Sequence, residues 1–134
     1  MANGRTMSDP VRLAPIGLGR WSRVLARGAQ RGSVIELASC FSPREESRTA
    51  FREEFGIPRA AENLDELLSD PEIEGVIVTT PNDAHKPVIL DCLEAGKAVY
   101  TDKPIAHTIE DAAEIAAAVD RTGMVFAVGH SARR

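Results

Sequence analysis

The chain has 134 residues, of which 43% are hydrophobic. This length and composition can build the core of one domain but leave no room for a second one. Sixteen basic and twenty acidic residues give a net charge of −4, so the composition offers no basic field for nucleic acid or for an anionic membrane.

The first residues and the cysteines indicate a protein of the cytoplasm. No apolar run approaches the ~20 residues that a membrane span needs, and residues 1–9 lack the apolar core of a signal peptide. We expect residues 1–9 to be a disordered leader and residues 10–134 to form the domain. Cys40 and Cys92 lie in apolar runs without metal-ligand spacing, which predicts two free, buried thiols in a reducing compartment.

Hydrophobic spacing alternates between strand and helix patterns from residue 11 onward, which is typical of an α/β protein. The first strand is predicted at Val11–Ile16, and a glycine-rich turn separates it from a helix at 21–31. A second strand at 34–41 is continuous in apolar and small residues, as expected for a strand covered on both faces. A helix over 44–55 follows and ends at Gly56.

The second half of the chain repeats the alternation. A rudimentary edge strand is expected at 59–62, before a short helix that Asn63 can cap. The strongest strand pattern is 75–80, and residues 81–83 are predicted to turn the chain and cap the next helix. The remaining expected elements are a helix at 85–95, a strand at 98–100, a helix at 109–121 capped by Thr108, and a strand at 124–128.

These six strands with right-handed crossovers predict a doubly wound, mainly parallel six-stranded sheet of the Rossmann type. Its strand order is expected to reverse between the first and fourth strands. Ligands of such sheets bind in the crevice at that switch point, outside the carboxyl ends of the strands. Polar residues that follow these strands are therefore the candidates for a site.

A glycine turn closes the first predicted strand. Its spacing is that of a dinucleotide-binding loop with serine in the third glycine position: Gly17-Leu18-Gly19-Arg20-Trp21-Ser22. The first glycine permits a tight turn, the second lets the backbone approach a pyrophosphate, and the helix beyond supplies amide donors. We predict that residues 17–21 bind the cofactor. A strand-to-helix turn without a ligand is the alternative that so short a motif leaves open.

The second predicted strand ends without the acidic residue that NAD-binding proteins usually offer to the ribose hydroxyls. Ser42 and Arg44 stand there instead, and a guanidinium matches the geometry of a phosphate. We predict that both contact a 2′-phosphate and that the cofactor is NADP or NAD, with a slight preference for NADP. The alternative is that Ser42 caps a helix with Pro43 in its first position, while Arg44 is only solvated.

Polar residues also follow the strand pattern at 75–80. Thr80, Pro81, Asn82 and His85 lie beside the expected switch point, where short side chains can reach the ribose and nicotinamide ends of a cofactor. We predict that these four residues contribute to the cofactor site. Helix capping explains Asn82 equally well, and a surface or capping role stays open for His85.

A lysine stands at the carboxyl end of the next strand, within Thr101-Asp102-Lys103-Pro104. Its place between Asp102 and Pro104 is difficult to explain as simple solvation of a helix face. An ammonium there can donate to a substrate oxygen and stabilise negative charge during hydride transfer. Lys103 is therefore the candidate catalytic residue.

These motifs occur together in an order that resembles one known family. The order is a glycine turn, Thr-Pro-Asn-x-x-His, Ala-Gly-Lys, Asp-Lys-Pro and Val-Gly-His-Ser-x-Arg-Arg. From about residue 11 to 134, the chain resembles the N-terminal domain of the Gfo/Idh/MocA family, named after glucose-fructose oxidoreductase, inositol 2-dehydrogenase and rhizopine catabolism. The motifs are specific jointly and weak singly.

The resemblance implies roles near the nicotinamide. By it, Lys103 belongs to the family's Glu-Lys-Pro motif and contacts the nicotinamide ribose and the substrate. Asp102 replaces the usual glutamate, is one methylene shorter, and is expected in the same site. The resemblance also implies a position near the nicotinamide for His130, for which a simple strand-terminal histidine is the alternative.

The resemblance further implies an oxidoreductase that transfers hydride between the cofactor and a sugar, polyol or related cyclic alcohol. The family places an Asp and a His in a C-terminal substrate domain whose open sheet commonly builds a homo-oligomer, and this domain is absent from the sequence. The chain is therefore expected to bind a nicotinamide dinucleotide without turning over a polyhydroxylated substrate. The alternatives are a stand-alone nucleotide-binding or sensor module acting with a partner, and a structural domain without a ligand.

Overall fold

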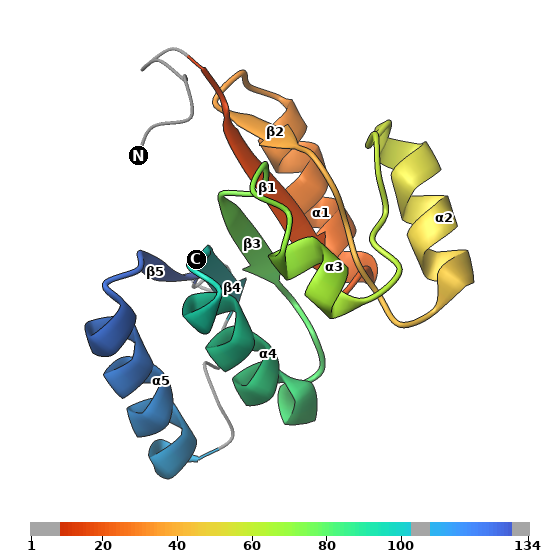
Figure 1. Ribbon diagram of the computed structural model, residues 1–134. Helices are drawn as coiled ribbons and strands as arrows, with labels where there is room; N and C mark the ends of the chain where they lie inside the picture. The colour runs from red at the N-terminus through yellow and green to blue at the C-terminus, as the bar shows by residue number, and fades with distance from the viewer. Residues whose placement is uncertain (1–8, 103–107, 130–134) are drawn as a thin grey trace.

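A computed structural model of the chain describes residues 9–102 and 108–129, except for the side chain of Asn82. In chain order the elements are β1 (Val11–Ile16), α1 (Arg20–Gln30), β2 (Ile35–Leu37), α2 (Glu45–Phe55), α3 (Leu64–Leu68), β3 (Gly75–Val78), α4 (Asn82–Glu94), β4 (Ala98–Asp102), α5 (Ile109–Thr122) and β5 (Phe126–Gly129). The strands form one parallel sheet in the order β2-β1-β3-β4-β5, with helices on both faces (Figure 1).

The strand order reverses between β1 and β3. Strand β3 is the one predicted as the fourth strand at 75–80, so the reversal lies where the sequence predicts it. From β1 the chain moves outward to β2 at one edge, and from β3 it moves outward through β4 to β5 at the other. The last residues of the two central strands, Ile16 and Val78, are partners in register. Their carboxyl ends therefore meet at one place, which is where a doubly wound sheet binds its ligands.

The described sheet has five strands, so the expectation of a sixth strand at residues 59–62 is wrong. One backbone hydrogen bond ties this segment to the chain after β2, from Ala61 N–H to Cys40 O at 2.9 Å. Both ends of the segment are charged and exposed, and only Ala61 is buried. So short and polar a stretch buries too little side-chain surface to extend the ladder.

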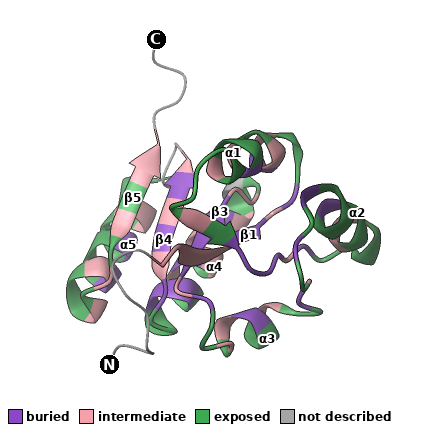
Figure 2. Ribbon diagram, turned by 90° about the horizontal axis from the view of Figure 1, so that it is seen from above, coloured by how far each residue is buried: buried purple, intermediate pink, exposed green. Residues whose placement is uncertain are grey.

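Apolar side chains form two cores, one on each face of the sheet, and Figure 2 shows burial concentrated in the central strands and the inner faces of the helices. The first core lies under α1 and α2 and includes Cys40 and Phe51. The second lies under α3, α4 and α5 and includes Cys92 and Ile89. Strand β3 is buried along its whole length because it faces both cores, which explains its uninterrupted apolar sequence.

Helix ends follow the predicted caps at two places and differ at a third. Asn63 Oδ1 accepts from Glu66 N (2.8 Å), and Thr108 Oγ1 accepts from Asp111 N (3.0 Å). Helix α4, however, begins at Asn82 with Pro81 in the cap position, so residues 82 and 83 are helical and do not form the predicted turn and cap. None of the described helices is long and apolar enough to cross a membrane.

Candidate dinucleotide-binding site

The turn after β1 needs glycine at position 17 because of its backbone and its neighbours. Gly17 has φ +88°, and a Cβ there would lie 3.0 Å from both Thr79 C and Thr80 N. Thr79 also bonds to the turn, since its hydroxyl donates to Gly17 O (2.9 Å). The ends of β1 and β3 are thus in close contact at the switch point, and a side chain at position 17 would force them apart.

The N-terminus of α1 lies at this turn with its amides open. Gly19 is in the cap position, and among the described residues no side chain makes a capping hydrogen bond there. The first turn also contains no acidic residue. A Cβ built on Gly19 meets no heavy atom of the described chain within 4 Å, so the space over the amides is free for a ligand. Such a helix end binds anions through its N–H groups and its dipole.

The side chains of the glycine loop meet this space in different ways. Leu18 is 7% exposed and packs into the core under α1 and α2, whereas Arg20 is exposed. Ser22 is 1% exposed. Trp21 Nε1 and Ser22 Oγ are buried polar atoms without a hydrogen-bond partner in the part of the chain that the structure describes. Buried donors ordinarily have partners, so these two, in the first turn of a helix that no described side chain caps, fit a ligand with phosphate oxygens.

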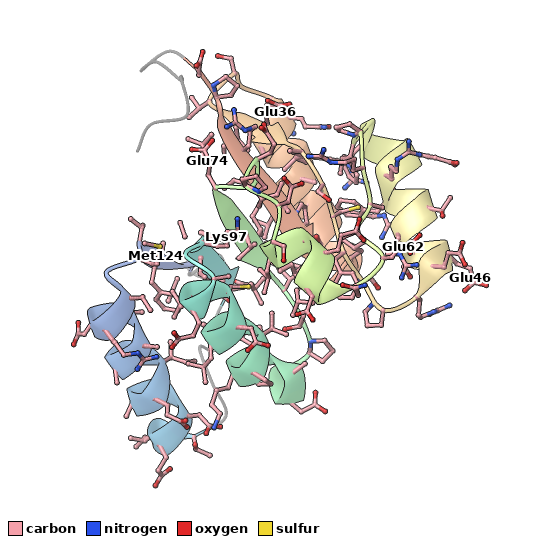
Figure 3. All side chains as sticks on the ribbon, viewed as in Figure 1. Glu36, Glu46, Glu62, Glu74, Lys97 and Met124 are labelled. Carbon is pink, nitrogen blue, oxygen red and sulfur yellow. The ribbon has the colours of Figure 1, made fainter. Side chains whose placement is uncertain are left out.

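Ser42 and Arg44 follow β2, but α2 begins later than the capping alternative requires. The helix starts at Glu45 with Arg44 in the cap position, so Pro43 lies outside it. Ser42 Oγ is 3.5 Å from Arg44 N, at the limit of a hydrogen bond. The Arg44 side chain is 75% exposed and pairs at 3.2 Å with Glu46, which Figure 3 labels beside the start of α2. An exposed pair of this kind is weak, so the guanidinium is available to a phosphate.

His85 is 4% exposed at the end of the first turn of α4, so the surface role left open for it is wrong. Its Nδ1 lies 3.2 Å from Thr80 Oγ1, and its Nε2 lies 2.8 Å from Thr101 Oγ1. Thr101 is fully buried in β4 and also donates to Val78 O (3.0 Å). Both ring nitrogens already have protein partners, and the structure therefore gives no support to the predicted direct contact between His85 and the cofactor.

The other predicted residues after β3 lie at the mouth of the site. Thr80 is half-buried directly beside the glycine turn. Pro81 is exposed in the cap position of α4, and Asn82 is the first residue of that helix. The structure thus brings Thr80 to the switch point and leaves Pro81 at its rim.

Asp102 ends β4 and pairs in register with Gly129, the last residue of β5. Its Oδ1 is buried without a hydrogen-bond partner among residues 9–102 and 108–129. A Cβ on Gly129 would lie 3.4 Å from Asp102 Oδ1, an ordinary contact, but would collide with Tyr100 Oη, so a side chain there would require the Tyr100 ring to move. The predicted residues Lys103 and His130 lie outside the described residues.

Two threonines of this arrangement were missed as site residues by the sequence analysis. Thr79 anchors Gly17, and Thr101 anchors His85. The available signal was a polar β-branched residue at the end of each strand pattern. Their roles depend on which strands are neighbours, and a pattern along the chain does not contain that information.

Fold and site together define an α/β domain built to bind a dinucleotide at the carboxyl ends of its parallel strands. Residues 11–130 match the GFO_IDH_MocA family model, described as an oxidoreductase family with an NAD-binding Rossmann fold. The chain belongs to this family.

Three similar proteins illustrate the match. The 1,5-anhydro-D-fructose reductase of Ensifer adhaerens is 35% identical over 118 residues, which cover 88% of this chain and 35% of the relative. The scyllo-inositol 2-dehydrogenase (NAD(+)) of Bacillus subtilis strain 168 is 30% identical over 128 residues, which cover 95% of this chain and 37% of the relative. The crystal structure of a putative NADPH-dependent oxidoreductase from Desulfitobacterium hafniense has a TM-score of 0.91 at 37% identity, covering 96% of this chain and 37% of that one. The chain therefore spans little more than a third of the length of each.

Proposed function

We propose that this chain is the NAD(P)-binding domain of an oxidoreductase that transfers hydride between a nicotinamide cofactor and a sugar, polyol or related cyclic alcohol. The observation that carries the proposal is the N-terminus of α1 at the switch point, which no side chain of the described residues caps and where Gly17 lies against Thr79 and Thr80. Family membership and the substrates named for relatives support it.

In this proposal each part of the site meets one part of the cofactor. The amides of α1 bind the pyrophosphate, with Trp21 Nε1 and Ser22 Oγ as further donors. The Thr80 hydroxyl and Asp102 Oδ1 lie toward the ribose and nicotinamide end. A bound nicotinamide supplies the carbon that accepts or donates hydride, and Lys103 donates to the substrate oxygen and stabilises its charge.

The finer parts of the proposal concern the cofactor and the setting. We propose a slight preference for NADP, supported by Ser42 and Arg44 at a strand end that has no carboxylate in residues 41–44. We propose a cytoplasmic location, supported by the free, buried thiols of Cys40 and Cys92. By itself the 134-residue chain is expected to bind cofactor without oxidising polyols, because the family resemblance puts the acid/base pair in another domain.

Gly19→Ala tests the binding function. The added methyl meets no described atom within 4 Å and φ −87° suits alanine, but alanine is a poorer N-cap than glycine, so stability should fall by at most about 1 kcal/mol. A pyrophosphate over the amides of α1 would collide with the methyl. We expect calorimetric affinity for the dinucleotide that binds best, among NAD, NADH, NADP and NADPH, to fall by about tenfold or more.

Gly28→Ala is the matched control, since it makes the same change inside α1, also without a described atom within 4 Å. It should leave affinity within about twofold and raise stability by roughly 0.5–1 kcal/mol through helix propensity. If the wild-type chain binds none of the four dinucleotides, the proposed function is wrong. If Gly19→Ala binds as tightly as wild type, the pyrophosphate does not lie over α1.

A further inference from the structure

A chain of hydrogen bonds joins the ends of β3 and β4 through one buried imidazole. Thr80 Oγ1 lies 3.2 Å from His85 Nδ1, and His85 Nε2 lies 2.8 Å from Thr101 Oγ1. Thr101 Oγ1 in turn lies 3.0 Å from Val78 O. His85 and Thr101 are 4% and 0% exposed, so the bond between them does not compete with bulk water.

The two carbonyls near Thr101 Oγ1 indicate a direction for these hydrogen bonds. Thr101 has one hydroxyl proton, and Val78 O (3.0 Å) and Asp102 O (3.4 Å) can only accept, so we assign that proton to the shorter bond, to Val78 O. His85 Nε2 must then carry a hydrogen and donate it to Thr101 Oγ1. In a neutral ring Nδ1 is the acceptor, and it takes the proton of Thr80.

The direction of these hydrogen bonds determines what Thr80 can offer to a ligand at the mouth of the site. The only hydroxyl proton of Thr80 is committed inward to His85, so toward the ligand its oxygen can act solely as an acceptor. Thr80 is half-buried, and its backbone nitrogen lies 3.0 Å from the position of a Cβ on Gly17. The acceptor therefore stands beside the glycine turn, where a sugar hydroxyl is the kind of group that it would bind.

We propose that His85 is a positioning residue, which in its neutral Nε2–H form holds the Thr80 hydroxyl as an acceptor for a ribose hydroxyl of the dinucleotide. The role rests on the proposed function. His85 does not touch the cofactor. Its bond to Thr101 fixes the ring against β4, and its bond to Thr80 fixes the orientation of the Thr80 hydroxyl at the binding surface.

Two substitutions separate these two bonds. The amide oxygen of asparagine can take the place of Nδ1 as acceptor, whereas the amide NH₂ of glutamine can take the place of Nε2–H as donor. His85→Gln keeps the anchor to Thr101, so its urea midpoint should stay near that of wild type while dinucleotide affinity falls about tenfold. His85→Asn keeps the bond to Thr80, so its urea midpoint should fall while affinity stays within about threefold.

Two further variants complete the design. Thr80→Val should lose about as much affinity as His85→Gln, and the double variant should lose no more than either alone, because both act through one hydroxyl. Ile115→Val removes a methylene from the core under α3, α4 and α5 without touching a hydrogen bond of the site, and should lower stability without changing affinity. Affinity losses that follow stability in all variants, or a glutamine variant that binds as wild type does, would make His85 a structural residue only.

Nitrogen-15 NMR of the histidine rings tests the proton direction in the unmodified chain. His85→Gln assigns the signals among the three histidines. The expected spectrum shows a neutral ring with hydrogen on Nε2, and a ring with hydrogen on Nδ1, or on both nitrogens at neutral pH, overturns the proposal. A wild type that binds no dinucleotide refutes the proposed function and this role together, whereas binding without coupling between Thr80 and His85 refutes only the role.

Discussion

Arg44 carries an exposed guanidinium at the start of α2, where the 2′-phosphate of NADP is proposed to lie. Its present partner Glu46 is 86% exposed and holds it weakly. We expect Arg44→Ala to lower NADP affinity about tenfold and NAD affinity by less than twofold, as measured by calorimetry. Arg31→Ala removes the same charge at the C-terminal end of α1, away from the glycine turn, and should change the affinity for neither cofactor. Equal losses for both cofactors would show that Arg44 contacts no phosphate.

Lys103 is proposed to stabilise charge on the substrate oxygen, and its test needs the protein with its substrate domain. Lys103→Met should lower turnover by roughly 10²-fold, the scale for a single preorganised donor, with a change in stability within about 0.5 kcal/mol. Lys86→Met is the control, because Lys86 pairs with Asp111 and Glu114 between α4 and α5. Unchanged turnover with a large drop in melting temperature would make Lys103 structural.

At the scale of elements, one buried lysine joins the loop before β3 to the start of β4. Lys97 is 6% exposed, and its Nζ donates to Asp70 O and Ile73 O, both at 2.8 Å (Figure 3). Burial lowers the pKa of this ammonium, and the negative charge of Asp70 offsets part of that effect by raising it. The lysine of the Ala-Gly-Lys motif therefore has a structural role here, since it donates to Ile73 O and adds a second donor to Asp70 O, which already accepts from Ile73 N (3.2 Å).

Lys97→Met should destabilise the chain by roughly 1–3 kcal/mol, because the thioether fills similar volume but leaves Ile73 O without its lysine donor, while Asp70 O keeps only its bond from Ile73 N. Urea unfolding measures the loss. Lys86→Met is again the comparison, and its partly exposed ion pairs with Asp111 and Glu114 should contribute less than the buried bonds of Lys97. A smaller loss for Lys97→Met than for Lys86→Met would mean that Ile73 O finds another donor.

At the scale of the whole molecule, the two cysteines report on the two cores. Cys40 lies in the core under α1 and α2, and Cys92 in the core under α3, α4 and α5. Burial raises the pKa of Cys40 to about 11 and that of Cys92 to about 12, so neither thiol is ionised at pH 8. Because the folded pKa values are raised, their contribution to stability is complete below about pH 9 and is lost as the pH rises toward 11 and 12.

We expect both thiols to be protected from a thiol reagent at pH 8. The free energy of the unfolding event that exposes each thiol should be the same for both. A chain of this size with one sheet between its cores should unfold as a unit. The single-cysteine variants Cys40→Ala and Cys92→Ala assign each rate, and the urea-unfolded chain provides the unprotected rate. Much faster labelling of one thiol would show that the two layers open separately.

The elements could be predicted where the signal is local, and less well where it depends on partners. Asn63 and Thr108 cap their helices as predicted, because a cap needs only a side chain three residues before the amide it binds. Residues 59–62 failed as a strand, since a strand exists only when a neighbour pairs with it. α4 starts earlier than its apolar pattern because Pro81 O accepts from Ala84 N (2.9 Å) and thereby begins the helix.

By itself, the sequence determined the doubly wound fold class, the glycine turn and the polar ends of the strands, because hydrophobic period and turn glycines act over a few residues. Only the tertiary structure decided what those polar ends do. His85 and Thr101 are 16 residues apart and meet because Val78 and Thr101 are partners in register between β3 and β4. The same pairing of strands buries a histidine that the sequence pattern placed at a ligand, since burial is a property of neighbours in space and not of neighbours along the chain.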